Sequence, residues 1–317
     1  MKKTWYLIIG VVLLVIGCIA YGYHEHYKPK TAQELKTVRV AYLPITHALP
    51  VFATKELETA NGPVHVELVK YGSWPELMDA LNTGKVDAAA VLVELGVKAR
   101  EQGIDVRAAA LGHTEGNIII VNKDINSVQD LKGKSFAIPH KQSTQKVLVD
   151  CMLEEAGLSE KDVQIVEMSP PEMPSALSVG QIAGYSVAEP FGSLALEMGT
   201  GKVFEDPDHL WHDNICCALV FNGQFVDEHH DLAKAFTKAY LDAGTYLDEH
   251  PKAQEEISSK YMKFNASVIE RSLKVIGFKD LALTEDRYNA LVHHMTHIDL
   301  IKKVPSYSEF VDQSLLP

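Results

Sequence analysis

The residues best suited to bind a ligand gather in six short turns, each between a run that favours a strand and a run that favours a helix. The turns are residues 44–47, 72–74, 93–96, 112–117, 139–144 and 188–191, and they hold three histidines, His47, His113 and His140, and one lysine, Lys141. A helix start presents unpaired backbone N–H groups and attracts anions. Together the turns predict an oxyanion site built mainly from neutral dipoles. For each residue alone, a helix cap or a solvated loop is the simpler interpretation.

Motifs for other chemistry are missing. The sequence contains no P-loop, no GxSxG, no HExxH and no GxGxxG, so we predict neither catalysis nor a cofactor. After Cys18 the cysteines are Cys151, Cys216 and Cys217, an odd number that implies no disulfide framework. Cys216 and Cys217 lie in ICCALVF, which we interpret as a buried strand. We predict no metal site, because such a site would be expected to show CxxC spacing with partner histidines.

Residues 165–199 give the clearest example of these turns. IVEM (165–168) predicts a strand that stops at Pro170. A short helix over 172–179 ends at Gly180, a second strand covers 182–187, and Glu189-Pro190 opens the next helix. Turns after successive parallel strands meet at one edge of the sheet, where open α/β folds bind ligands. A βαβ unit without a ligand is the alternative.

The rest of the chain repeats this alternation. Strands are predicted at 37–43, 64–71, 86–93 and 106–111, with Thr46 and Ser73 as candidate N-caps of the helices that follow. A second α/β unit begins near residue 120, with Ser143 and Thr144 as candidate caps of a helix over 145–156. Everything after Asp227 looks helical. No internal repeat is found.

This order of elements predicts an α/β fold with two lobes, parallel-rich sheets, helices on both sheet faces and a helical C-terminal part. Lobe 1 would comprise residues 37–120 and a return over 205–317, and lobe 2 would be inserted as residues 121–204. Ligands of hinged folds bind between the lobes. A single larger sheet is the alternative.

Composition and the N-terminus narrow the class further. The chain has 317 residues, 46% of them hydrophobic, and a net charge of −12 without a basic block, which argues against a nucleic-acid partner. Lys2 and Lys3 precede an apolar run over 5–16, as in an export signal. Residues 15–18 (VIGC) resemble a bacterial lipobox, so residues 1–18 would be the signal, Cys18 the lipidated N-terminus and 19–36 a tether. An uncleaved membrane anchor is the alternative. Either way, the chain would be held at the outer face of the cell membrane.

Residues 38–300 resemble the solute-binding proteins of ABC importers for nitrate, sulfonates and taurine. The matching stretches are ITHALPVFATKEL (45–57), YGSWPELMDALNTGKVDAAAV (71–91), SPPEMPSALSVGQIAGYSVAEPFGSLA (169–195) and the segment 209–221 that ends in HDNICCALVF. PPEM followed by AEPF is most similar to the nitrate and bicarbonate branch. The resemblance implies a periplasmic-binding-protein type II fold and a monomer that captures a small anion between its lobes. A sulfonate, nitrate or a related oxyanion would then pass to permease and ATPase subunits.

The resemblance implies ligand contacts from Thr46, His47, Ser73, Trp74 and Glu189. A purely structural role for Glu189 is the alternative, because a carboxylate would repel a bound anion. From their positions in the other turns we add six candidates: Glu94, His113, Asn117, Gln142, Ser143 and Thr144.

GHTEGN (112–117) and HKQST (140–144) depart from the family pattern and leave other ligands open. A thiamine-precursor or riboflavin-like heterocycle is one alternative. Thiamine-pyrimidine synthases resemble the family but act inside cells and use a histidine with bound iron, so the export signal argues against an enzyme of that kind. A tethered sensor or adhesion module is a further alternative.

Overall fold

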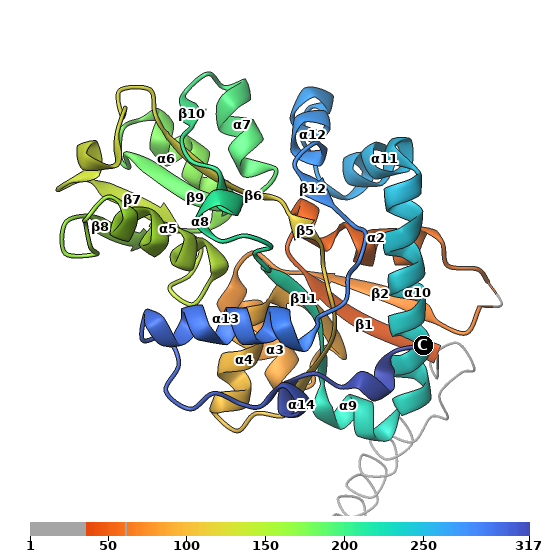
Figure 1. Ribbon diagram of the computed structural model, residues 1–317. Coiled ribbons are helices and arrows are strands. Elements are labelled where there is room, and N and C mark those ends of the chain that lie inside the picture. The colour runs from red at the N-terminus through yellow and green to blue at the C-terminus, as the bar shows by residue number, and fades with distance from the viewer. Residues whose placement is uncertain (1–35, 61) are drawn as a thin grey trace, which may run out of the picture. The chain divides into compact units, whose positions relative to one another are not determined.

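The structure is a computed structural model that describes residues 36–60 and 62–317 (Figure 1). Residues Val38–Pro317 form one compact unit. The predicted signal, Cys18 and almost all of the predicted tether lie outside the described residues. Among the described helices, none is both long and apolar enough to cross a membrane.

The first of two five-stranded sheets has the strand order β2-β1-β3-β11-β4. Its strands are β1 (Thr37–Tyr42), β2 (His65–Lys70), β3 (Ala88–Leu92), β4 (Val106–Leu111) and β11 (Cys217–Asn222). The central strand β3 has the sequence AAAVL and is buried throughout, as expected for a strand covered on both faces. Between the strands lie η2 (Thr46–Ala48), α2 (Leu49–Glu56), α3 (Trp74–Asn82) and α4 (Val93–Glu101). We call this sheet and its helices lobe 1.

The second sheet has the order β10-β6-β9-β7-β8. Its strands are β6 (Asn117–Asn122), β7 (Ser135–Ile138), β8 (Gln164–Glu167), β9 (Gly184–Ala188) and β10 (Gly201–Val203). With it lie η3 (Val128–Leu131), α5 (Thr144–Glu155), η4 (Pro170–Glu172), α6 (Met173–Ser178) and α7 (Phe191–Glu197). We call this sheet and its helices lobe 2. Figure 1 draws it mostly in green.

Both sheets are mixed. Strand β1 is parallel to β3, and β7 is parallel to β8 and β9, whereas β11 is antiparallel to β3 and β4, and β6 is antiparallel to β9. The reason lies in the two crossings between the lobes. A chain that arrives from the other lobe enters the sheet at the edge where the parallel strands end, so β6 and β11 run in the opposite direction.

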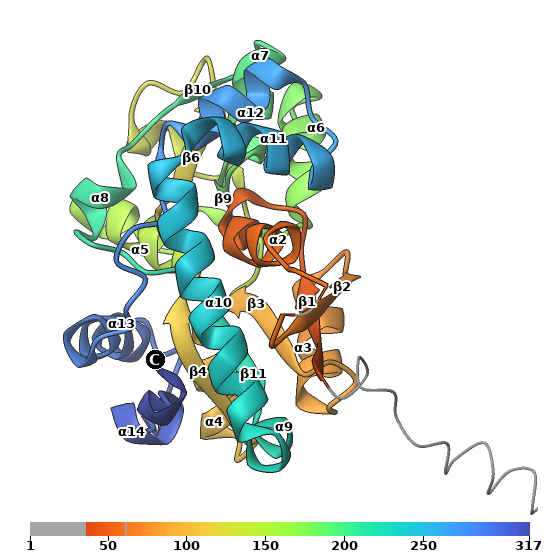
Figure 2. The same ribbon diagram turned by 90° about the vertical axis from the view of Figure 1, so that its right-hand side faces the viewer.

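The C-terminal part is mostly helical, as predicted. After α8 (Pro207–Leu210) and β11 come α9 (Gly223–Glu228), α10 (His230–Glu249), α11 (Pro251–Tyr261), α12 (Ala266–Leu273), α13 (Glu285–His297), α14 (Tyr307–Phe310) and η5 (Gln313–Leu315). A two-residue strand, β12 (Ile276–Gly277), pairs with β5 (Thr114–Glu115) in the first crossing. Helix α10 packs along α2 of lobe 1, and α12 contacts α7 of lobe 2 (Figure 2). This part therefore contacts both lobes.

Candidate functional site

Four chemically reactive side chains meet where strands of lobe 1 end at the junction with lobe 2. They are His47 in η2, His113 just after β4, and Cys216 and Cys217 at the start of β11. One ligand atom from each lies within 4.8 Å of the others, and all four residues are buried. We call these four residues the Cys-His cluster. Sequence reasoning placed the histidines in a ligand site but not the cysteines.

The backbone of neighbouring strands fixes the two cysteines. The Val93 N–H donates to the Cys216 carbonyl and the Gly112 N–H donates to the Cys217 carbonyl, both at 2.7 Å. The start of β11 is thus held between the ends of β3 and β4. Cys216 lies one residue before the strand begins, and the two sulfurs are only 3.9 Å apart. Adjacent cysteines can therefore face one site here, without the CxxC spacing that the sequence argument required.

Two glycines allow the close approach of these segments. A Cβ on Gly112 would lie 2.9 Å from the His47 carbonyl oxygen and 3.3 Å from the Cys217 Cβ. Gly116 has a φ of +83°, and its carbonyl accepts a 2.9 Å hydrogen bond from Nε2 of His47. A side chain at either position would push His47 away from the cysteines.

The histidine rings lie against each other, with their centroids 3.5 Å apart. In the neutral ring, donation from Nε2 of His47 to Gly116 leaves the lone pair on Nδ1, and this atom lies 3.6 Å from the Cys217 sulfur. Nε2 of His113 receives a long, 3.4 Å contact from the Cys217 N–H. Nδ1 of His113 is buried and has no hydrogen-bond partner in the described part of the chain.

Burial and mutual contact shift the pKa values of the cluster. Burial alone raises the pKa of the Cys216 thiol, but hydrogen bonds with Cys217 and both imidazoles, and the field of His47, hold it well below its ordinary value. Burial and the Cys216 thiolate raise the pKa of Cys217 well above its ordinary value. Burial, with His47 alongside, lowers the pKa of His113 to about 4. These shifts favour loss of a proton from Cys216 before Cys217, and they favour the neutral form of His113.

Glu94, at the start of α4, contacts lobe 2 through Thr144. Burial, reinforced by Cys216, raises the pKa of Glu94 well above its ordinary value. The Thr144 hydroxyl lies 2.5 Å from Oε1 of Glu94 and 2.8 Å from the Ile215 carbonyl. A hydroxyl has one proton to donate, so when Thr144 donates to Ile215, the short contact requires a proton from Glu94. The neutral form of this carboxyl fits both observations.

A chain of amides continues the junction on the other side of the cluster. The Gln145 Nε2 donates to Oδ1 of Asn117 at 2.6 Å and to the Cys216 sulfur at 3.3 Å. The Asn117 Nδ2 donates to Oδ1 of Asn214 at 2.9 Å. Gln145, from α5 of lobe 2, thereby contacts the second crossing, and its own Oε1 has no partner in the described residues.

Thr46 and Glu189 form a third link between the lobes. The Thr46 N–H and hydroxyl both donate to the Glu189 carbonyl oxygen, at 3.0 and 2.9 Å. The Glu189 carboxylate accepts hydrogen bonds from the Ser193 N–H and hydroxyl, at 2.9 and 2.8 Å, and so caps α7. The prediction that Thr46 caps a helix is wrong. Ile45 is the N-cap of η2 and Ala48 is that of α2, and the hydroxyl of Thr46 bonds across the junction instead.

The remaining predicted residues lie at helix starts. Ser143 is the N-cap of α5, as predicted, and its hydroxyl accepts from the Lys146 N–H. Ser73 holds the N-cap position of α3 but makes no side-chain cap bond. Trp74 is buried, and its Nε1 has no partner in the described residues. Gln142 is half-buried. No hydrogen bond given by the described residues links Ser73, Trp74 or Gln142 to the Cys-His cluster, so their ligand contacts stay predictions.

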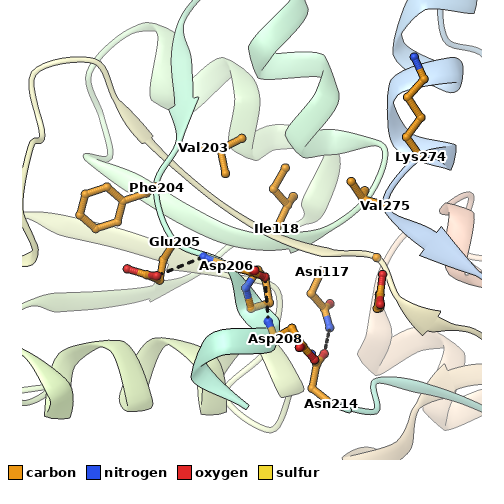
Figure 3. A pocket seen from close by; sticks show the side chains of 13 residues that line it. Asn117, Ile118, Val203, Phe204, Glu205, Asp206, Asp208, Asn214, Lys274 and Val275 are labelled. Carbon is orange, nitrogen blue, oxygen red and sulfur yellow. Dashed lines mark hydrogen bonds between the residues drawn. The ribbon is translucent and has the colours of Figure 1, made fainter. Parts of the chain in front are cut away.

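A hollow of about 620 Å³ opens beside the junction (Figure 3). Asn117 and Asn214 form part of its wall, and Gly116 lines it too. Four acidic side chains line the hollow, those of Glu115, Glu205, Asp206 and Asp208, and Lys274 is the one basic residue in its lining. In Figure 3, Val275 lies across this space from Ile118, and the Lys274 side chain extends along its own helix, where its Nζ donates to Glu270. The hollow thus extends to the amides of Asn117 and Asn214, and Asn117 in turn contacts Gln145, which contacts Cys216.

Four residues of the site were missed from the sequence: Gln145, Asn214, Cys216 and Cys217. Gln145 and Asn214 gave no distinctive signal. The cysteine pair did give one, because it stands at the start of a buried strand and follows the polar residues 213–214 after a single residue, Ile215. Reading that position as the start of a strand at the ligand edge, rather than as strand interior, would have placed both sulfurs near the first histidine.

Comparison with known proteins finds a matching family model and several relatives that are transport proteins. A model of the NMT1-like family matches residues 31–261. A putative aliphatic sulfonates-binding protein of Bacillus subtilis is 28% identical over 86% of this chain and 82% of its own length. The nitrate import ATP-binding protein NrtC of Synechocystis sp. is 25% identical over 68% of this chain, which spans 36% of NrtC. Other relatives are named as nitrate/nitrite-binding and taurine-binding periplasmic proteins.

Among solved structures, a ligand-binding component of an ABC-type import system from Staphylococcus aureus, with zinc bound, matches with a TM-score of 0.84. It is 35% identical, and the match covers 88% of this chain and 97% of that one. These findings confirm the predicted resemblance and the predicted α/β fold of the periplasmic-binding-protein type. They also show that the related proteins are transport binding proteins.

Proposed function

The chain belongs to the NMT1-like family, and we propose that it is the extracytoplasmic substrate-binding component of an ABC importer, which captures its ligand at the junction of its two lobes. The main support for this proposal is the set of polar residues buried at the junction. Glu94 of lobe 1 contacts Thr144 of lobe 2, and Gln145 of lobe 2 contacts the Cys216 sulfur beside His47 and His113. All of these residues are buried. Polar residues buried between two lobes are what a binding protein needs to enclose a small ligand. Permease and ATPase subunits are the partners, as the ATP-binding relative suggests, and the chain itself performs no catalysis.

Cys18 would anchor the protein to the membrane as a lipidated N-terminus, which the export-signal pattern supports. Mass spectrometry of the chain isolated from membranes tests this. A mature chain that begins at a diacylated Cys18 is the expected result. An intact N-terminus starting at Met1 would replace lipidation by a membrane-spanning anchor.

A small anion is the first candidate ligand. The names of the sulfonate-, nitrate- and taurine-binding relatives support it, as does the gathering of helix starts predicted from the sequence. The side chains of the junction support it less. They include no lysine or arginine, and Lys141, the one predicted cation, is exposed and faces Glu167. The sulfurs of Cys216 and Cys217 and the unpartnered Oε2 of Glu94 are acceptors, which offer an anion no hydrogen bond.

A transition-metal ion is the second candidate. The zinc-bound relative from Staphylococcus aureus favours it, since this is also the relative with 35% identity over nearly its whole length. The Cys-His cluster favours it independently, because nitrogen and sulfur donors are the ligands that zinc prefers.

Calorimetry on the purified full-length chain tests the proposed function. The panel contains nitrate, taurine, an alkanesulfonate, bicarbonate, Zn²⁺ and a thiamine-like heterocycle. We expect one member to bind at one site per chain, and Asn117→Ala to weaken that binding while Gln224→Ala on the exposed face leaves it unchanged. If no member binds, or if the two variants behave alike, the junction is not the substrate site.

A further inference from the structure

We infer that His47, His113, Cys216 and Cys217 form a four-ligand site for a single divalent transition-metal ion with zinc-like coordination. The inference deepens the proposed function and rests on it for one point, that the junction is where the importer component holds its ligand. The metal ion would then be the ligand that the lobes enclose. The argument itself depends on distances, tautomers and charge in the cluster.

Two distances in the cluster already match a tetrahedral zinc site before any metal is added, and all four ligand atoms lie within 4.8 Å of one another. With Zn–S bonds of about 2.3 Å and Zn–N bonds of about 2.0 Å, two sulfur ligands lie about 3.8 Å apart and a sulfur and a nitrogen about 3.6 Å apart. The two cysteine sulfurs are 3.9 Å apart, and the Cys217 sulfur is 3.6 Å from Nδ1 of His47. Little movement is needed to place one ion among these atoms.

The first histidine is already oriented as a ligand. Metal-binding imidazoles usually donate their second ring N–H to a carbonyl or carboxylate, which fixes the tautomer and the ring. Nε2 of His47 makes this bond to the Gly116 carbonyl, and a glycine is needed there because any Cβ would lie 3.0 Å from that nitrogen. Nε2 of His113 lies 3.4 Å from the Cys217 backbone nitrogen, so this ring nitrogen faces the cysteines and is the one placed to bind the ion.

Charge also favours a cation. Two thiolates, two neutral imidazoles and a divalent ion sum to zero, so the metal-loaded cluster can be buried without an unpaired charge. The four ligand atoms of the cluster are electron-pair donors, which bond to a cation and not to an anion. The unpartnered buried atoms nearby, Oε2 of Glu94 and Oε1 of Gln145, are acceptors rather than donors. They suit a cation or a metal-bound water, not an oxyanion.

The hollow beside the cluster also favours a cation over an anion. The hollow beside Asn117 and Asn214 is lined by four acidic side chains and one lysine. An acidic approach raises the local concentration of cations. Behind the amide pair, Gln145 contacts both Asn117 and the Cys216 sulfur, so the amides separate the cluster from the hollow.

Titration with Co²⁺ provides the test, because Co²⁺ takes zinc-like sites and its spectrum reports thiolate ligands and tetrahedral geometry. The full-length chain is purified in detergent with a phosphine reductant, stripped by a chelator and titrated. We expect one Co²⁺ per chain, thiolate-to-metal charge-transfer bands and displacement by Zn²⁺. A wild-type spectrum without thiolate bands at one equivalent of Co²⁺ would overturn the inference. This test uses the wild-type chain alone, so it does not depend on whether a variant folds.

Variants then assign the ligands. Cys216→Ser and Cys217→Ser should each remove about half of the charge-transfer intensity and weaken Co²⁺ binding at least about 100-fold, since loss of an outer partner alone costs 10–100-fold. Cys151→Ser is the matched control, because Cys151 is a half-buried free cysteine outside the cluster. Circular dichroism checks that each variant is folded. Full binding by both cluster variants, with only surface histidines as ligands, would contradict the site.

The two proposals can fail separately. If the stripped chain binds taurine or nitrate at one site but never binds Co²⁺ through thiolates, the importer function stands and the metal inference is wrong. If Co²⁺ binds as expected but Thr144 and Gln145 can be replaced without affecting it, the metal site stands and enclosure by the lobes is wrong.

Discussion

The two lobes bring different chemistry to their shared junction. Lobe 1 supplies the imidazoles and thiols of the Cys-His cluster, groups that can bond directly to a ligand. Lobe 2 supplies a hydroxyl and an amide, on Thr144 and Gln145, which form hydrogen bonds to lobe 1 and to the second crossing. The difference suggests a division of work, in which lobe 1 selects the ligand and lobe 2 stabilises the closed form. Substitutions on each side should therefore have different signatures.

The largest effect is expected on the lobe 1 side, from Gly112→Ala. The new Cβ would lie 2.9 Å from the His47 carbonyl oxygen, a backbone atom that cannot rotate away. Overpacking of this kind costs about 1–3 kcal/mol, and we expect the upper end together with loss of tight Co²⁺ binding. Denaturant unfolding and Co²⁺ titration measure the two effects.

Gly72→Ala is the matched control for that substitution. Gly72 also follows a strand of lobe 1, but its Cβ would meet only the end of the Glu76 side chain, at 3.9 Å. Its free energy of unfolding and Co²⁺ affinity should stay close to those of the wild type. Equal behaviour of the two variants would mean that the approach of β4 to η2 does not shape the cluster.

The contrast between the lobes also explains what the sequence could predict. Strand positions followed from apolar runs such as 106–111, which matches β4 to the residue. Periodicity and turn residues are local signals, and they suffice to predict an α/β class. The antiparallel direction of β11 was not predicted, because it depends on the crossing between lobes, and no local pattern encodes where a chain returns.

The site was predicted only in part, because local signals indicate strand ends but not contacts between segments far apart in the sequence. His47 and His113 could be named because each follows a predicted strand, and strand ends converge at one edge. Cys216 was set aside because the spacing rule for metal sites assumes ligands on one continuous segment. Here the cysteine pair lies at the start of a strand, and Cys217 contacts histidines 104 and 170 positions away in sequence. The hydroxyl of Thr46 was likewise assigned to a local cap although its partner is 143 residues away.

A smaller and more specific effect is expected on the lobe 2 side, from Thr144→Val. This change keeps the shape of the side chain but leaves the Ile215 carbonyl and Glu94 without their shared hydroxyl partner. Unmade buried hydrogen bonds cost about 1–3 kcal/mol, and the loss should fall on the closed form. We expect roughly tenfold weaker Co²⁺ binding in titration, with the thiolate bands of the bound form unchanged.

Thr237→Val serves as the control for this lobe 2 substitution. The Thr237 hydroxyl is equally buried but bonds only to the Ala233 carbonyl within α10. Its removal should leave metal affinity unchanged. If Thr144→Val abolished the thiolate bands instead of weakening binding, lobe 2 would take part in selection, and the proposed division between the lobes would be wrong.

The smallest expected effect is on the free energy of unfolding, and it compares serine substitutions at one helix N-terminus in each lobe. Ser143 in lobe 2 accepts a hydrogen bond from the Lys146 N–H, whereas Ser73 in lobe 1 holds the same position without a side-chain cap bond. Loss of a serine N-cap costs about 1 kcal/mol, so Ser143→Ala should lower the free energy of unfolding by that amount and Ser73→Ala by less than half of it. Urea unfolding of both variants measures this difference. A larger loss for Ser73→Ala would show that its hydroxyl has a role beyond the helix start, and ligand titration of that variant would then identify Ser73 as the contact that the family resemblance implies.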